Sequence, residues 1–389
     1  MADYFERALE AHEKVRGKIG INKKMPVETR DDLSLAYTPG VARPCEVIAA
    51  DPARAYDLTL KGNSVGIVTD GSSVLGLGNI GGLAALPVME GKALLFKEFA
   101  GIDAWPICLD TQETEAIIET VRRIAPVFGG INLEDIAAPR CFEIEDRLQD
   151  LGIPVFHDDQ HGTAIVLLAA LINAERVTGK KMGDMRVIIN GAGAAGTAIA
   201  KMLRCVGHDP DVCVPVKDVI MCDSKGAIHA KREGLSPEKE AFLAYTNGEG
   251  RSGSLGEVIE GVDVFIGVSR GNLLSGDDVR RMAPGAVILA MANPVPEIMP
   301  EDALAAGAAI VCTGRSDFPN QVNNSLAFPG VFRGALDVRA PAITSAMKIA
   351  AAHALADSVE SPSPEEVIPH PLDRAVPKNV AAAVQAAAG

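Results

Sequence analysis

The feature that most constrains this fold is a glycine-rich turn between a predicted strand and a predicted helix. The apolar run RVIIN at 186–190 leads directly into GAGAAG, and the helix-forming segment TAIAKML follows. In such a setting one glycine makes the tight turn, one lets a pyrophosphate approach the backbone, and one lets the helix pack closely on the strand. The unpaired N–H groups at the start of the helix also favour an anion. The turn therefore predicts a dinucleotide site formed by Gly191, Ala192, Gly193, Ala194 and Gly196.

The end of the next predicted strand indicates which dinucleotide binds. The strand VIMC leads into Asp223, whose carboxylate can accept hydrogen bonds from the ribose hydroxyls of NAD. Lys225 lies two residues further on and could instead meet the 2′-phosphate of NADP. The sequence therefore predicts NAD as the cofactor and leaves NADP open.

A second match to the glycine pattern, GLGNIG, contains Gly76, Gly78 and Gly81. No full strand leads directly into it, and Pro87 is expected to break the helix that should follow. We interpret these glycines as a turn, or as a close approach of the backbone to a small ligand, and not as a second dinucleotide site.

Short apolar segments alternate with helical segments along most of the chain. The runs SVGIVT at 64–69 and IPVFHD at 153–158 are two such predicted strands. This alternation is typical of a parallel α/β sheet. We predict an α/β protein with an N-terminal α/β substrate and metal domain at 1–160 and a Rossmann-type dinucleotide-binding domain at 161–389. The proline-rich segment from Ser361 is expected to form a surface arm that ends in a short helix.

Four acidic residues lie near the ends of two predicted elements. Asp158 and Asp159 follow one predicted strand, and Glu134 and Asp135 sit together about 24 residues upstream. Bringing four carboxylates together is costly unless a cation neutralises them. Carboxylate oxygens without clustered cysteines suit Mg²⁺ or Mn²⁺. The alternative for the two aspartates is capping of a helix predicted to begin near Thr163.

Two histidines frame the aspartate pair and raise the question of zinc. His157 and His161 have the i, i+4 spacing of zinc ligands on a helix. The predicted strand and Gly162 place them in a turn, which disfavours that reading.

Two further residues could carry proton transfer. Lys92 is a lone lysine in an apolar helical stretch, where burial would lower its pKa and make it a base. The alternative is an ammonium group that reaches solvent along an apolar stem. Tyr37 lies in a proline-glycine turn, where a ring can simply pack. Asn293, before Pro294 at a strand end, is either a turn residue or a ligand contact.

Composition excludes several classes of function. The chain has 37 Lys and Arg against 51 Asp and Glu, a net charge of −14, so we expect no binding to nucleic acid or anionic membranes. The longest apolar run, 164–172, is far shorter than the roughly 20 residues of a membrane span. The N-terminus has no apolar signal core, which predicts a cytoplasmic protein. Seven cysteines without a CxxC pair predict reduced thiols rather than a disulfide framework or a zinc site.

Taken together, these segments resemble the malic enzyme family, specifically its short bacterial form. Eight motifs occur in the family's order from about residue 15 to about residue 350: AYTPGVA, VTDGSSVLGLGNIGG, MEGKALLFK, INLEDI, FHDDQHGTA, NGAGAAG, MANPVPEI and NQVNNSLAFPGVFRG. One departure is Ser73, which stands where long-chain relatives carry an arginine that clamps a substrate carboxylate.

The resemblance implies oxidative decarboxylation of L-malate to pyruvate and CO₂, with reduction of NAD or NADP and a divalent metal. It implies a homodimer whose N-terminal region is exchanged between subunits. It also implies residue roles: Lys92 as general base with Asp158 beside it, Tyr37 as general acid, Glu134, Asp135 and Asp159 as metal ligands, and Asn293 with Asn323 or Asn324 as contacts to nicotinamide and substrate. Two alternatives remain open, a malolactic activity with bound NAD and a catalytically inactive dinucleotide sensor.

Overall fold

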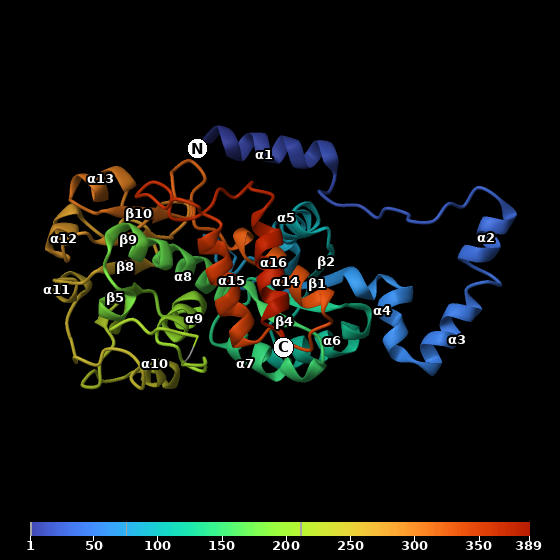
Figure 1. Ribbon diagram of the computed structural model, residues 1–389, viewed down its shortest axis with the longest axis horizontal. Helices are drawn as coiled ribbons and strands as arrows, with labels where there is room; N and C mark the ends of the chain where they lie inside the picture. The colour runs from blue at the N-terminus through green and yellow to red at the C-terminus, as the bar shows by residue number, and fades with distance from the viewer. Residues whose placement is uncertain (1, 75, 211) are drawn as a thin grey trace.

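Two parallel sheets organise the chain in the computed structural model, which describes residues 2–74, 76–210 and 212–389 (Figure 1). The first sheet has four parallel strands in the order β2–β1–β3–β4. Its strands are β1 (Ser64–Thr69), β2 (Asp103–Cys108), β3 (Gly130–Leu133) and β4 (Val155–His157).

The second sheet has six strands in the order β10–β9–β8–β5–β6–β7, and only β7 is antiparallel. These strands are β5 (Arg186–Asn190), β6 (Asp218–Asp223), β7 (Gly226–Ala227), β8 (Val264–Gly267), β9 (Val287–Ala290) and β10 (Ile310–Thr313). The strand order reverses between β5 and β8, the point at which open α/β sheets bind ligands. The predicted α/β fold class, with a Rossmann-type second half, is therefore confirmed.

Helices α5 (Gly82–Ala100), α6 (Thr114–Ile124) and α7 (Arg140–Arg147) accompany the first sheet. Pro87 lies inside α5, so the prediction that it breaks the helix is wrong. An internal proline costs about 3 kcal/mol. Here Met89 and Phe96 on the same helix are fully buried, and this packing outweighs the cost.

Helix α8 (Asp158–Thr178) links the two sheets and is buried along most of its length. It begins five residues before the predicted start at Thr163. His157 occupies the N-cap position of α8, but its side chain makes no hydrogen bond to the helix N-terminus. The capping interpretation of Asp158 and Asp159 is therefore wrong, because both already lie in the first turn.

Five helices accompany the second sheet: α9 (Ala194–Leu203), α10 (Pro237–Phe242), α11 (Leu255–Val258), α12 (Gly276–Arg281) and α13 (Pro300–Ala305). Short 3-10 turns complete the described elements: η1 (Pro52–Arg54), η2 (Leu60–Asn63), η3 (Ala125–Val127), η4 (Gln149–Leu151), η5 (Met182–Asp184) and η6 (Asn324–Leu326). Among the helices of the described residues, none is both long and apolar enough to cross a membrane.

The C-terminal helices return to the first sheet. These are α14 (Phe328–Asp337), α15 (Ser345–Asp357) and α16 (Val376–Ala386). The ring of Phe328 lies 4.7 Å from that of Phe96 on α5. Gly330 on α14 lies so close to α16 that a Cβ there would come within 2.7 Å of Val380. The final helix thus packs against α14. The predicted surface arm that ends in a short helix is confirmed, because residues 361–366 and 370–375 ahead of α16 are exposed or half-buried.

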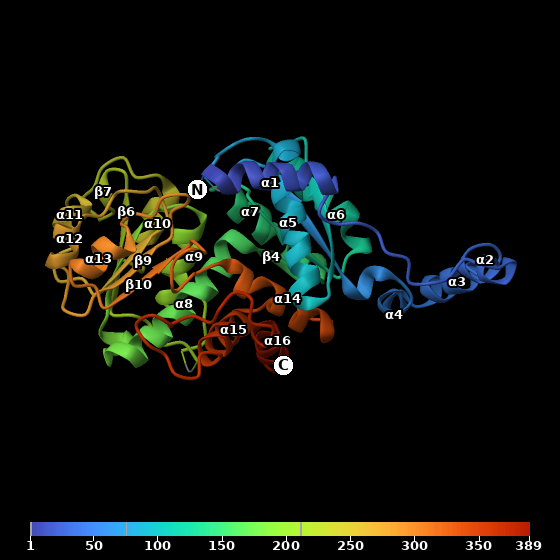
Figure 2. The same cartoon turned by 90° about the horizontal axis from the view of Figure 1, so that it is seen from above.

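The N-terminal helices behave differently. Helix α1 (Ala2–Val15) lies along the body, whereas α2 (Arg30–Ala36) and α3 (Ala42–Ala50) project away from it, ahead of α4 (Ala55–Leu58) (Figures 1 and 2). We call residues 20–58 the N-terminal arm. The described residues of α2 and α3 include no buried side chain. Ile21 and Leu35 of the arm are largely exposed.

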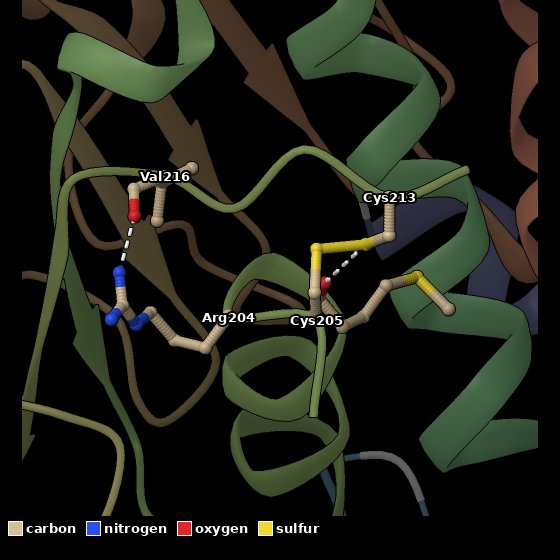
Figure 3. The surroundings of a disulfide bond; sticks show 5 residues. Arg204, Cys205, Cys213 and Val216 are labelled. Atoms are coloured by element: carbon tan, nitrogen blue, oxygen red, sulfur yellow. Dashed lines mark hydrogen bonds between the residues drawn. A yellow bond between two sulfur atoms is a disulfide. The ribbon is translucent and has the colours of Figure 1, made fainter. Parts of the chain in front are cut away.

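One pair of cysteines is bonded, contrary to the prediction of seven reduced thiols. Cys205, just after α9, forms a disulfide with Cys213 (Figure 3). The eight-residue separation is not a spacing that signals a bond, because the pairing depends on how the loop returns past α9. The other described cysteines are free.

Candidate active site

The pairing of β3 with β4 brings the four acids together. Leu133 at the end of β3 pairs with His157 at the end of β4. Because the strands are parallel, the residues that follow both strands meet at one edge of the sheet. Glu134 and Asp135 therefore face the start of α8.

Three of these acids form a cluster that could hold a metal. One oxygen each from Glu134, Asp135 and Asp159 lies within 4.8 Å of the others. The backbone N–H of Asp135 donates to Asp159 Oδ2 at 2.8 Å. Asp135 Oδ2 is buried and has no hydrogen-bond partner among the described residues.

The electrostatics of the cluster also fit a set of ligands for a cation. Burial, reinforced by Asp159 and Glu134, raises the pKa of Asp135 to about 9. Burial raises the pKa of Glu134 to about 7, although Lys92 opposes the shift. Closely spaced, buried carboxylates are suitable ligands for a hard divalent cation such as Mg²⁺ or Mn²⁺. The cluster therefore fits the metal that the sequence predicts. Because cysteine and histidine do not belong to the cluster, the described residues give no support to zinc.

The loop that carries Asp135 is held by residues that the sequence analysis did not identify. Asp135 has a φ of 54°, in the left-handed region, where only a firmly held loop keeps a residue of this kind. Its carbonyl accepts the N–H of Ser73 at 2.9 Å. Arg140 donates to Asp70 at 2.8 Å and to Ser72 at 3.0 Å, which fixes the DGSS turn against the loop.

Lys92 lies between two of the acids. Its ammonium group pairs with Asp158 and lies 3.1 Å from Glu134 Oε1 and 4.6 Å from the ring centre of Phe328. The side chain is only 11% exposed, so the alternative that it reaches solvent is wrong. Burial alone would lower its pKa, but the charges of Asp158, Glu134 and Asp159 outweigh burial and raise it. The expected lowering is therefore wrong, because it neglected the carboxylates that the fold places beside this lysine.

Asp158 has a defined neighbourhood of its own. It is fully buried, burial raises its pKa to about 6, and its Oδ1 has no hydrogen-bond partner among the described residues. A Cβ on Gly162 would lie 1.9 Å from that oxygen and 3.2 Å from Cβ of Asn324. A side chain at position 162 would therefore displace the Asp158 carboxylate, and Asn324 packs beside this glycine. Asn323 instead caps η6 by accepting the N–H of Ser325 at 2.9 Å.

The glycine turn has the geometry that dinucleotide binding requires. A Cβ on Gly191 would come within 2.7 Å of the Val268 carbonyl, and one on Gly196 within 1.8 Å of the Gly191 carbonyl. Around Gly193, the cap of α9, the described residues leave open space within 4 Å of a Cβ. Two glycines thus permit close packing and the third leaves room for a ligand at the helix start.

Asp223 is surrounded by cations that the sequence analysis missed. Arg232 donates to both carboxylate oxygens, at 2.8 and 2.7 Å, and Lys239 donates at 2.6 Å. The N–H of Lys225 adds a fourth bond at 2.8 Å. Burial would raise the pKa of Asp223, but these hydrogen bonds outweigh it and lower the pKa to about 2. The carboxylate is thus already satisfied before any ribose approaches.

Asn293 lines a cavity of about 530 Å³ at the carboxyl ends of β9 and β10. A Cβ on Gly76 would lie 3.1 Å from the Asn293 carbonyl, so the second glycine run approaches this loop closely. Glu297, fully buried, accepts the N–H groups of Ala292 at 3.1 Å and Ser269 at 3.4 Å. This acid therefore ties the loop after β8 to the loop after β9.

Two family models together match nearly the whole chain. The model described as "Malic enzyme, N-terminal domain" matches residues 16–149, and "Malic enzyme, NAD binding domain" matches residues 160–389. The chain belongs to the malic enzyme family. The resemblance stated from the motifs is therefore confirmed.

Individual relatives cover the chain almost completely. It is 56% identical to the bifunctional malic/malolactic enzyme of Bacillus subtilis, across 98% of this chain and 92% of that protein. It is 54% identical to the NAD-dependent malic enzyme of Geobacillus stearothermophilus, across 96% and 77%. The crystal structure of the NAD-dependent malic enzyme of Thermotoga maritima has a TM-score of 0.92 at 50% identity, covering 97% of this chain and 98% of that one.

One predicted catalytic residue of this malic enzyme family member, Tyr37, lies away from the cluster. Tyr37 ends α2 on the N-terminal arm and is 67% exposed. Figures 1 and 2 both show that arm projecting away from α5, which carries Lys92. Within one chain, the structure does not bring Tyr37 to the acids.

Proposed function

We propose that this protein oxidises L-malate and decarboxylates it to pyruvate and CO₂, with a nicotinamide dinucleotide as hydride acceptor and Mg²⁺ or Mn²⁺ as metal. The proposal rests on one observation: three acids that could together bind one cation lie beside a buried lysine. The dinucleotide turn of the second sheet and membership of the malic enzyme family support it. A spectrophotometric assay with malate, Mn²⁺ and NAD or NADP in turn tests it, because NADH or NADPH absorbs at 340 nm and pyruvate can be measured separately.

Lys92 is proposed as the general base. It removes the proton of the C2 hydroxyl while the hydride leaves C2 for the nicotinamide. Asp158, paired with its ammonium group, orients the lysine and tunes its pKa. A bound divalent cation would supply the positive charge that stabilises the enolate formed when CO₂ leaves. Because such a charge also offsets the carboxylates that hold the proton on Lys92, it favours the neutral lysine that the base must be.

Tyr37 is proposed to protonate C3 of the enolate in the site of a second subunit. The exposed apolar side chains of the N-terminal arm support a homodimer in which the arm crosses to the partner. In this arrangement each site takes its lysine and acids from one chain and its tyrosine from the other.

Mixing two inactive variants tests this arrangement. Tyr37→Phe and Lys92→Ala dimers should each be inactive, whereas co-expressed chains should recover about a quarter of wild-type activity. The reason is that about half of the dimers are mixed and one of their two sites holds both residues. Activity with malate is measured on the whole population of co-expressed dimers, purified through one tag that both chains carry. Activity of the mixed dimers no higher than that of the single variants would contradict the exchange.

For the cofactor we propose NAD as the preferred dinucleotide, with NADP also accepted. Asp223 ends the strand at which the ribose is expected, but Arg232 and Lys239 cancel the charge that would repel a 2′-phosphate. We expect kcat/KM for the two dinucleotides to differ by less than about 100-fold, since roughly 2.7 kcal/mol of discrimination is more than a neutralised carboxylate supplies. Initial rates with each dinucleotide at saturating malate and Mn²⁺ measure the ratio. A Lys239→Gln variant should lose efficiency with NADP and keep it with NAD, and the reverse would contradict the proposal.

A malolactic activity is the second candidate, because the Bacillus subtilis relative is named as bifunctional. In that reaction the reduced dinucleotide stays bound and the product is lactate. Product analysis separates the two: pyruvate with release of NADH supports the proposed reaction, and lactate without net NADH supports the malolactic one.

A further inference from the structure

A buried glutamate lies behind the acid cluster and has no part in the chemistry described so far. Glu145 belongs to α7 and is 7% exposed. One of its oxygens accepts the backbone N–H of His157 at 3.0 Å. The other accepts from Nε2 of Gln160 at 3.0 Å, and Nε2 of His161 lies 2.9 and 3.0 Å from the two oxygens.

All three of these partners belong to one five-residue segment, the junction between β4 and α8. Between them in sequence stand Asp158 and Asp159, whose side chains contact Lys92 and the Asp135 backbone N–H instead. Glu145 therefore binds the residues on both sides of the two catalytic-site acids without touching those acids. Rotation of this first turn would move both of them.

The junction needs such an anchor because it lacks the usual one. The side chain of His157 makes no capping bond to α8, and neither of its ring nitrogens has a hydrogen-bond partner among the described residues. A negative charge near the start of a helix is also favourable. Glu145 thus replaces a local cap with a contact from a different helix.

A carboxylate suits this position, because one oxygen can accept from the backbone N–H of His157 and the other from the side chain of Gln160. An amide would offer one acceptor oxygen in place of two. Burial would raise the pKa of Glu145, but the neighbouring His161, with Lys348 and His157, outweighs burial and lowers it to about 2. The residue is therefore a charged acceptor at neutral pH.

We propose that Glu145 is a positioning residue, which sets the first turn of α8 so that Asp159 reaches the metal cluster and Asp158 reaches Lys92. This role rests on the proposed function, because it concerns the cation that the cluster would hold. Residues that orient metal ligands from outside the coordination sphere affect metal affinity by about 10- to 100-fold.

The isosteric variant Glu145→Gln tests the role. Its dissociation constant for Mn²⁺, measured by the electron paramagnetic resonance signal of free Mn²⁺ well below the melting temperature, should rise about 10-fold or more. Its affinity for NAD should stay within twofold of wild type, because the glycine turn lies on the other sheet. A purely structural role would lower the melting temperature and leave Mn²⁺ affinity of the folded protein unchanged.

Glu143→Gln is the matched control, since Glu143 lies on the same helix, is exposed and pairs with Arg147. It should bind Mn²⁺ like wild type. Should Glu145→Gln not fold, Gln160→Ala keeps the Glu145–His161 contact, removes one donor, and should weaken Mn²⁺ binding by a smaller factor. Unchanged Mn²⁺ affinity in the folded variants overturns the role of Glu145 alone. A wild-type protein that binds no Mn²⁺ overturns the metal site and this role together.

Discussion

Replacing Lys92 with alanine should lower kcat/KM for malate by about 10³-fold or more and leave dinucleotide binding intact. General acid–base catalysis by one side chain contributes about 10²- to 10⁴-fold. The variant also leaves Asp158 and Glu134 facing each other without the cation that now separates them. Steady-state rates at 340 nm give the loss, and calorimetric titration with NAD gives the binding constant.

A second substitution at the same position separates proton transfer from charge. Arginine keeps a positive charge but does not deprotonate, so Lys92→Arg should be as inactive as Lys92→Ala if the lysine is the base. Lys97→Ala is the control, because Lys97 lies on the same helix, is more than half exposed and pairs with Asp103. Substantial turnover by Lys92→Arg would show that position 92 contributes charge alone.

Removal of Lys92 should not weaken metal binding. The ammonium group competes with a divalent cation for Glu134 and is repelled by it. We therefore expect Lys92→Ala to bind Mn²⁺ at least as tightly as wild type, while its turnover collapses. Loss of both properties together would mean that the lysine mainly maintains the shape of the cluster.

The sequence predicted the parts of the site that depend on single strands and their ends. Glu134 and Asp159 follow apolar runs, and parallel strands bring their carboxyl ends to one edge of the sheet. The proximity of these two acids could therefore be predicted from the sequence. The glycine turn could also be predicted, because its strand, turn and helix are contiguous in the sequence.

The features that were missed depend on contacts between distant segments. The pKa of Lys92 is set by acids that follow β3 and begin α8. Its local apolar sequence therefore predicted a lowered pKa, whereas the pKa is raised. Asp223 meets Arg232 and Lys239 only because the loop after β7 folds back. Tyr37 lies exposed on the N-terminal arm, which projects away from the acids within this chain. Local patterns carry no information on any of these distances.

Removing the metal should abolish malate oxidation, and restoring Mn²⁺ should recover it. The acids of the cluster present too much negative charge to act on an anionic substrate without a cation. Treatment with a chelator followed by dialysis, then titration with Mn²⁺, measures the recovery. Asp135→Asn should keep the fold and lose about 10²- to 10³-fold in kcat, the range for removal of one electrostatic stabiliser. Asp150→Asn, an exposed change in η4 at a residue that pairs with Arg122, serves as control.

The same cluster predicts how the metal affects stability at different pH. In the metal-free protein the pKa values of Asp135 and Glu134 are about 9 and about 7, above their values near 4 in an unfolded chain. The folded state therefore holds more protons than the unfolded state between pH ~4 and ~9, so the free energy of unfolding falls as pH rises through that window. Mn²⁺ binds the deprotonated acids and offsets this loss. The increase in melting temperature on adding Mn²⁺ should thus be larger at pH 8.5 than at pH 6, and proton release should accompany binding at pH 7. An equal increase at both pH values, with no proton release, would mean that these carboxylates do not bind the ion.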